Sequence, residues 1–185
     1  MEFRTLIERV GHILLQPDDT WETIRLEQIS ISEILKEYVL KLAAVPAAAH
    51  FLGWWVLVGF WSSLTRALLW YFLSVAGVWI ISKVIGLLAA QFGAEENETS
   101  TFKLAAFSFT PYFLAGICYI VPPMMIFVVV GGIYGFYLLY RGIPIVLEIP
   151  KEKAAPYAGM ISIAMFLVFC IIGRLTGGVL WPSKP

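Results

Sequence analysis

The sequence has 185 residues, of which 59% are hydrophobic and only 14% carry a formal charge, and its formal net charge is zero. A soluble domain averages about a quarter charged residues, and a chain of this length has too little interior to hide so large an apolar excess. A soluble globular class is therefore excluded. We expect an all-α integral membrane bundle, with membrane lipids as partners and no nucleic-acid partner.

The first 33 residues predict short amphipathic helices. Apolar residues recur at helical spacing over residues 3–14, with charged residues between them. Pro17 ends this pattern, and a capping-box-like start then begins a second helix that carries Trp21. Helices this polar suit the headgroup region or the cytoplasmic face rather than a crossing. We therefore predict an interfacial or cytoplasmic segment over 1–33 and a transmembrane domain over 34–181.

Long runs without formal charge predict five transmembrane helices. The run over 104–140 is too long for one crossing of a hydrocarbon core about 30 Å thick, and Pro122-Pro123 divides it. Arg66 is expected in the turn between the first two spans, and Gly142 is expected to end the fourth span with a left-handed cap. The expected spans are about 38–60, 68–90, 104–121, 123–141 and 157–176.

The distribution of charge predicts the orientation in the membrane. With the N-terminus inside, nine Lys and Arg residues fall on the cytoplasmic side and three on the opposite side, with Lys83 left out of the comparison. All 13 Asp and Glu residues fall on the side of the nine. This asymmetry favours a multi-pass protein of the cell (inner, cytoplasmic) membrane, with a cytoplasmic N-terminus and an outer C-terminus.

Two residues within the expected spans are candidates for an intramembrane function. Lys83 lies in the second span, where a charge is costly and often functional, although a lysine can also extend to the interface or form an ion pair. His50 lies in the first span, and we expect it to be neutral and bonded to a neighbouring helix. The two are expected at different depths, which argues against a proton relay between them.

Proline and glycine positions predict a kink and close helix contacts. Pro111 lies in the middle of the third span and is expected to kink it, as happens both in transport sites and in ordinary membrane helices. Gly131 with Gly135, and Gly173 with Gly177, have the spacing of closely packed helices. Such packing would serve either contacts within the chain or a homo- or hetero-oligomer.

The sequence contains no motif of an enzyme, a metal site or a cofactor site. Metalloprotease, serine-hydrolase and nucleotide-binding patterns are missing, and the two cysteines lie in apolar runs. We therefore expect a non-enzymatic protein with no catalytic residues, no cofactor and no bound metal.

Short motifs spread over most of the chain resemble those of the Yip domain family, membrane proteins named for interacting with Ypt/Rab GTPases. The motif residues are Pro17, Trp21, Pro111, Pro122, Tyr140, Arg141, Gly142, Pro150, Lys153 and Ala154. The resemblance implies a five-helix domain with a cytoplasmic N-terminus. The opening residues resemble bacterial and archaeal members, whereas eukaryotic relatives have a long cytosolic N-terminal region and act in vesicle traffic through Rab binding and hetero-oligomers.

The Tyr140-Arg141-Gly142 motif suggests a role in topology. We expect Arg141 to end a helix and to meet phosphate headgroups, with residues 143–149 lying along the interface before the next helix begins. The alternative for this motif is a docking site for a partner.

The leading functional hypothesis is a non-enzymatic membrane scaffold, or a protein that organises the membrane or binds a cytoplasmic protein partner, with its interaction surface on the cytoplasmic face. The alternative is a small transporter or channel that uses Lys83, His50 and the kinked third helix around Pro111.

Overall fold

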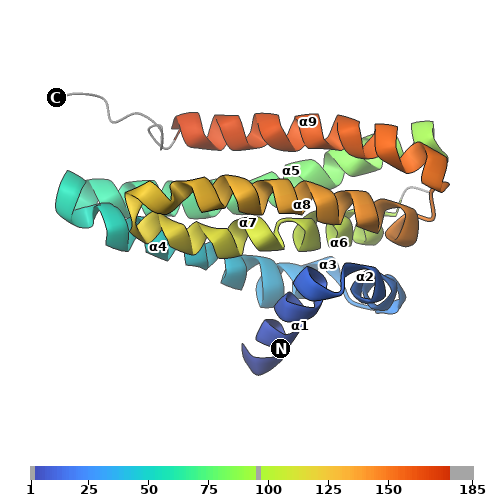
Figure 1. The fold of residues 1–185 in the computed structure, drawn as a ribbon, viewed down its shortest axis with the longest axis horizontal. Helices are drawn as coiled ribbons and strands as arrows, with labels where there is room; N and C mark the ends of the chain where they lie inside the picture. The colour runs from blue at the N-terminus through green and yellow to red at the C-terminus, as the bar shows by residue number, and fades with distance from the viewer. Residues whose placement is uncertain (1–2, 95–96, 176–185) are drawn as a thin grey trace.

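The computed structural model describes residues 3–94 and 97–175, and every regular element within these two ranges is a helix. Five helical stretches are long and apolar enough to cross a membrane. They run alongside one another in one elongated bundle (Figure 1). The all-α membrane bundle that the composition predicts is therefore confirmed.

The five stretches are built from several elements. The first contains α3 (Ile31–Ile34), the π-helical turn η1 (Leu35–Val39) and α4 (Leu40–Val58), and the second is α5 (Phe60–Phe92). The third contains α6 (Glu98–Ser108), α7 (Thr110–Ala115) and the 3-10 turn η2 (Gly116–Ile120). The fourth contains the 3-10 turn η3 (Pro122–Met125) and α8 (Ile126–Val146), and the fifth is α9 (Lys151–Leu175).

The two ends of the bundle differ in the loops they carry. Residues 93–94, 97–98 and 147–150 lie together at one end, on the right of Figure 1, and we call this the polar end. The turns at Gly59 and Val121 lie at the other end.

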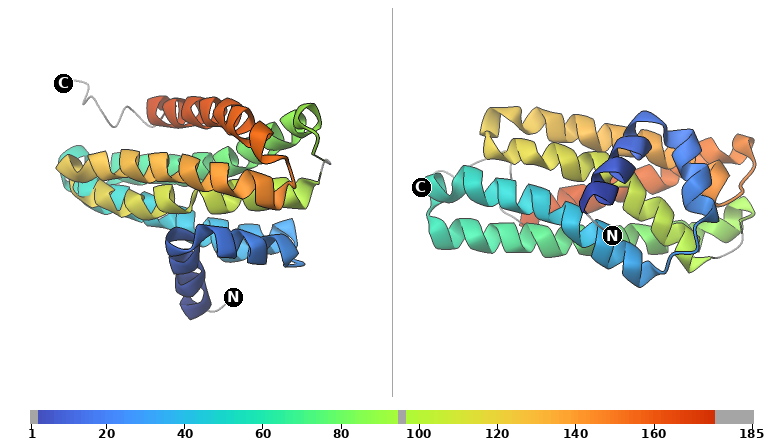
Figure 2. Two further views of the ribbon diagram at one scale, coloured as in Figure 1. Left: turned by 45° about the vertical axis from the view of Figure 1, so that its right-hand side comes forward. Right: turned by 90° about the horizontal axis from the view of Figure 1, so that it is seen from below.

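Two further helices lie along one side of the bundle, toward the polar end. They are α1 (Phe3–Leu15) and α2 (Pro17–Leu26). α2 packs against the bundle, whereas α1 runs across the long axis of the bundle and away from it (Figures 1 and 2). Whether α1 lies in a membrane interface stays a prediction.

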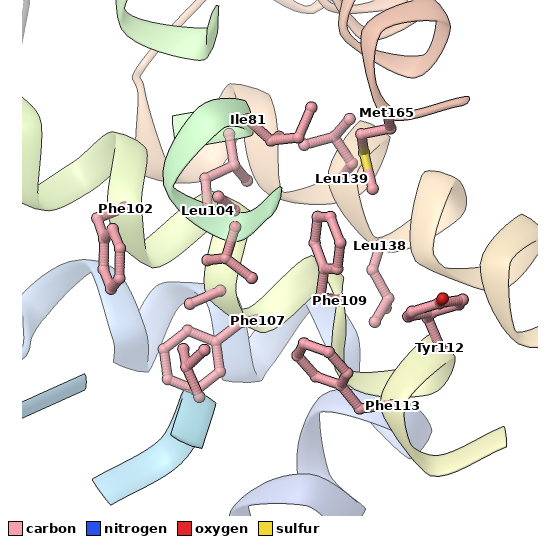
Figure 3. Close-up of a cluster of buried hydrophobic side chains, with 14 of the residues drawn as sticks. Ile81, Phe102, Leu104, Phe107, Phe109, Tyr112, Phe113, Leu138, Leu139 and Met165 are labelled. Carbon is pink, nitrogen blue, oxygen red and sulfur yellow. The ribbon is translucent and has the colours of Figure 1, made fainter. Parts of the chain in front are cut away.

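The centre of the bundle is aromatic, and α6 occupies it. Every residue from Thr101 to Ser108 is buried, so α6 is covered on all sides. Phe102, Phe107 and Phe109 of this region lie in the same buried cluster as Leu138 of α8 (Figure 3). The third stretch is therefore the core of the fold, and the other spanning helices surround it.

The boundary between the first two spans differs from the prediction. α4 ends at Val58 and α5 begins at Phe60, so Arg66 lies inside α5 and not in a turn. Gly59 has a φ of +85°, a conformation that costs glycine little, and this residue reverses the chain. The long side chain of an arginine or lysine inside a spanning helix can extend toward the interface. For this reason the first charged residue is a poor marker of a span boundary.

The third span is interrupted at Phe109, two residues before its proline. α6 ends at Ser108 and α7 begins at Thr110, because Pro111 has no N–H to donate to the carbonyl of Phe107 four residues earlier. The hydroxyl of Thr110 donates to that carbonyl instead, at 2.7 Å, and also contacts the hydroxyl of Tyr38 at 2.6 Å. The interruption is thus stabilised by side chains and costs no unpaired carbonyl at Phe107.

The first glycine pair is used inside the chain. A Cβ on Gly131 would lie 2.6 Å from the carbonyl oxygen of Pro111, and one on Gly135 would lie 2.7 Å from that of Ser108. Both glycines therefore let α8 approach the backbone around the interruption of the third span. The second pair, which ends at Gly177, lies outside the described residues.

Candidate functional site

α2 docks on α8 by placing a tryptophan on a glycine. Trp21 is fully buried and meets the ring of Phe107 edge-on at 6.2 Å. A Cβ on Gly142 would lie 2.7 Å from Cε2 of Trp21 and 2.6 Å from Cδ1 of Leu104. Only a residue without a side chain leaves room for this contact, since such distances are far below van der Waals separation.

One expectation about this segment is therefore wrong. Gly142 does not cap a helix, because α8 continues through it to Val146. Of the residues that follow, Ile143, Val146 and Ile149 are buried against the rest of the protein, and whether the segment lies along an interface stays a prediction. A glycine is needed at position 142, but the reason is its contact with Trp21, which is far away in the sequence.

Arg141 joins α8 to the beginning of α2. Its Nε donates to Oδ1 of Asp18 at 2.7 Å, and its Nη2 donates to Oδ2 of the same carboxylate. This is the two-pronged pairing that guanidinium groups make with carboxylates. Arg141 was expected to end a helix, but it lies within α8, which continues to Val146. Its contact with headgroups stays a prediction, and its pairing with Asp18 was not foreseen.

Arg25 joins the far end of α2 to the loop after α8. Its Nη1 donates to Oε1 of Glu148 at 2.7 Å, and its Nη2 donates to Oε2 of Glu22 at 3.3 Å. The hydrogen bond with Glu148 raises the pKa of Arg25 above its ordinary value. Glu148 itself has a φ of +54°, which is uncommon for a residue with a side chain.

Lys103 holds the C-terminal end of α2. This lysine is buried in α6, and its Nζ donates to the carbonyl of Ile24 at 2.8 Å and to that of Glu27 at 2.6 Å. The last carbonyls of a helix lack donors within the helix and attract positive charge, so an ammonium suits them. The charge-based prediction counted Lys103 only as a cytoplasmic basic residue; no local pattern reveals its burial.

An open pocket of about 740 Å³ lies between α2, the end of α8 and the start of α9. Its lining combines acidic, basic and apolar side chains. These residues are Asp18, Glu22, Arg25, Tyr140, Arg141, Pro144, Ile145, Glu148, Ile149, Pro150 and Ala154. The arrangement suits a ligand with charged or hydrogen-bonding groups, and it lacks a metal centre: no three metal-ligating side chains come together in the part of the chain that the structure describes.

The structure brings most of the motif residues to this pocket or to the helix contact beneath it. Tyr140, Arg141, Pro150 and Ala154 line the pocket, whereas Trp21 and Gly142 form the contact under it. The other motif residues are more scattered. Pro17 begins α2, Pro111 follows the interruption of the third span, Pro122 begins η3 at the other end, and Nζ of Lys153 lies near Gly93.

Lys83 and His50 do not come together. Nζ of Lys83 forms an ion pair with Oε1 of Glu98 at 2.5 Å, beside the loop of the polar end. His50 is buried toward the other end, stacked on Trp54 with ring centroids 5.8 Å apart. The Nδ1 of His50 has no hydrogen-bond partner among the described residues, so the expected bond to a neighbouring helix is not seen at this atom.

Comparisons with known proteins agree with the fold and with the motifs. The model of the Yip1 domain family matches residues 11–172. The chain is 28% identical over 189 aligned residues to "Inner membrane protein YohC" of Escherichia coli strain K12, covering 95% of this chain and 96% of that protein. The protein of the same name from an O6:H1 strain of Escherichia coli matches to the same extent. No solved structure matches the chain.

Proposed function

The chain belongs to the Yip1 domain family, and we propose that it is a non-enzymatic scaffold of the inner membrane that binds a partner at the polar end of the bundle. One observation carries this proposal. Two motifs of the family, around Trp21 and around Arg141, are distant in sequence and meet at one charged surface. Buried Trp21 and the hydrogen bonds of Lys103 hold α2 in place and so maintain this surface.

We further propose that the polar end faces the cytoplasm. The support is the asymmetry of nine basic residues against three, which places the acidic residues and the α2 pocket on the inner side. The relative named as an inner membrane protein is consistent with this location. A partner would then be a cytoplasmic protein or a neighbouring membrane component.

Crosslinking in the native membrane tests the scaffold proposal. A photoreactive amino acid in place of Glu22, which lines the pocket, is expected to capture a reproducible product that co-purifies with the full chain. The same substitution at Ser62, an exposed residue in the first turn of α5 at the other end, is the matched control. No reproducible product at residue 22, or the same product at both positions, would contradict a partner at the polar end.

The alternative function, a small transporter or channel, requires Lys83, His50 and the interrupted third span to share one path. The ion pair of Lys83 with Glu98 and the ring packing of His50 place the two residues in separate environments, which favours the scaffold. Purified protein in liposomes decides between the two. Solute flux that disappears in Lys83→Ala would overturn the scaffold proposal, and absence of flux across a panel of ions and small solutes would support it.

A further inference from the structure

The pocket at the polar end has hydrogen-bond donors and acceptors that the contacts within the protein leave unused. Arg141 engages Asp18 through Nε and Nη2, which leaves Nη1 for a ligand. Glu148 engages Arg25 through Oε1 and Glu22 does so through Oε2, which leaves one carboxylate oxygen on each. Their side chains are 72% and 57% exposed, so these oxygens are open to a ligand.

The charges are separated along the pocket. Arg141 lies in α8, which ends at Val146, and Glu148 lies in the loop beyond that end. An anion alone would meet three carboxylates, and a cation alone would meet two guanidinium groups. Asp18 already pairs with Arg141, and Arg25 pairs with Glu148 and Glu22, so the excess negative charge lies beside Glu148 and Glu22. A ligand that places a positive group there and a negative group at the free Nη1 of Arg141 is electrostatically favoured.

One side of the pocket continues into a surface that faces lipid. Ile133, Tyr137 and Tyr140 are exposed and recur at helical spacing on one face of α8, and Tyr140 also lines the pocket. The guanidinium of Arg141 lies 5.9 Å from the ring centre of Tyr137. Tyrosines at the end of a spanning helix mark the level of the headgroups, so the pocket opens where a phospholipid headgroup lies.

α1 adds a second exposed apolar surface on the same side of the bundle as α2. It meets α8 where the hydroxyl of Tyr134 donates to the carbonyl of Leu14 at 2.6 Å, and from there it runs across the bundle axis (Figure 2). The side chains of Ile7 and Leu15 on α1 are 55% and 83% exposed. A helix that lies across the bundle with exposed apolar side chains near its charged end is suited to rest in the membrane surface.

From these observations we infer that the pocket binds the headgroup of a zwitterionic membrane phospholipid, in which a phosphate and a primary ammonium are linked as in phosphoethanolamine. The phosphate accepts from Nη1 of Arg141, the ammonium donates to the open oxygens of Glu148 and Glu22, and the acyl chains follow the exposed face of α8. This inference goes beyond the scaffold proposal, because it requires no protein partner.

Native mass spectrometry of the full chain in detergent micelles tests the inference. Three lipids with identical palmitoyl and oleoyl chains are added in turn: phosphatidylethanolamine, phosphatidylglycerol and phosphatidylcholine. We expect phosphatidylethanolamine to bind at about tenfold lower concentration than the other two, because only its headgroup offers a positively charged N–H donor to a carboxylate. Phosphatidylcholine keeps both charges but has no N–H, so it isolates the contribution of these bonds.

Variants assign the preference to the pocket. Glu148→Gln removes the charge that receives the ammonium, and we expect it to reduce the binding of phosphatidylethanolamine to the level of phosphatidylcholine. Glu152→Gln makes the same change at an exposed carboxylate of α9 that does not line the pocket, and it should bind as the unchanged protein does. Glu22→Gln is a second pocket variant with the same expected direction, and circular dichroism checks that all three are folded.

Several results would overturn the inference. These are equal binding of the three lipids, tightest binding of phosphatidylglycerol, or the same loss in Glu152→Gln as in Glu148→Gln. Soluble phosphoethanolamine separates the headgroup from the lipid. If it displaces the lipid only at far higher concentration, the acyl chains take part as inferred; if it binds as tightly as the lipid, a membrane lipid is not the ligand. A failed crosslink at residue 22 would not affect any of these outcomes.

Discussion

The guanidinium of Arg141 binds both carboxylate oxygens of Asp18, although 123 residues separate the two in the sequence. Each residue lies in a different segment, and each of these segments separately resembles a motif of the Yip family. Their contact gives the two segments one physical role, which is to fix α2 on α8. With Trp21 on Gly142 and Lys103 on the C-terminal carbonyls of α2, the N-terminal helix is held at its beginning, middle and end.

Exchange of the two charges tests the contact between Arg141 and Asp18. Arg141→Asp alone should release the beginning of α2 and speed amide hydrogen exchange over residues 17–26. The loss of stability should be small, about 1 kcal/mol or less, because both side chains are partly exposed. The double variant with Asp18→Arg restores the opposite charges and should recover the protection. Equal exchange in the single and double variants would show that another contact holds α2.

Gly142→Ala should destabilise the fold by about 1–3 kcal/mol, because the new Cβ would overlap Trp21 and Leu104. Thermal unfolding in detergent measures the effect. Gly132→Ala is the matched control on the same helix, since a Cβ there meets no atom within 4 Å. An unchanged unfolding temperature in Gly142→Ala would mean that Trp21 does not pack there.

Lys103→Met keeps the length of the side chain but removes the donor to three carbonyls near the end of α2. An unsatisfied buried polar group costs about 1–3 kcal/mol, so exchange protection over residues 24–28 should fall markedly. Lys83→Met makes the same change at an exposed ion pair and should have little effect on stability. Similar losses in the two variants would argue against the buried role of Lys103.

Gly135→Ala distinguishes packing within the chain from association between protomers. The new Cβ would lie 2.7 Å from the carbonyl oxygen of Ser108, and because this is a backbone atom it cannot turn aside. We expect a lower unfolding temperature with no change in the oligomeric state in detergent. Gly159→Ala, where the same addition meets nothing, serves as the comparison. A shift from dimer to monomer at full stability would instead assign Gly135 to an interface.

Thiol labelling tests the orientation. Asp19→Cys on α2 and Ser62→Cys on α5 place exposed thiols at opposite ends of the bundle. With the polar end inside, a membrane-impermeant reagent should label residue 62 in intact cells and residue 19 only after permeabilisation. The native cysteines, Cys118 and Cys170, are changed to alanine in both variants. The reverse pattern would invert the assigned topology.

The general architecture could be predicted because lipid imposes simple rules. A spanning helix must be long and nearly free of charge, and these two conditions are sufficient to find five helices and an all-α bundle. The details at Arg66 and Gly142 could not be predicted in this way. Their positions depend on one glycine turn and on a tryptophan from another segment, and neither depends on local hydropathy.

The candidate site was foreseen only in its separate parts. Trp21, Arg141 and Gly142 were singled out as motif residues, but a single sequence does not show that they touch. Lys103 and Asp18 had no local signal, because burial of a lysine depends on the carbonyls that happen to surround it. Contacts between distant segments are the information that hydrophobic periodicity lacks.

The docking of α2 also bears on the order in which the protein matures. α2 leaves the ribosome before any spanning helix, yet the residues that receive it belong to α6 and α8, the third and fourth spans. Trp21 therefore has no burial site until the fourth span has been synthesised and inserted. Until then the nascent chain displays an exposed tryptophan, which makes burial of Trp21 a marker of completed assembly.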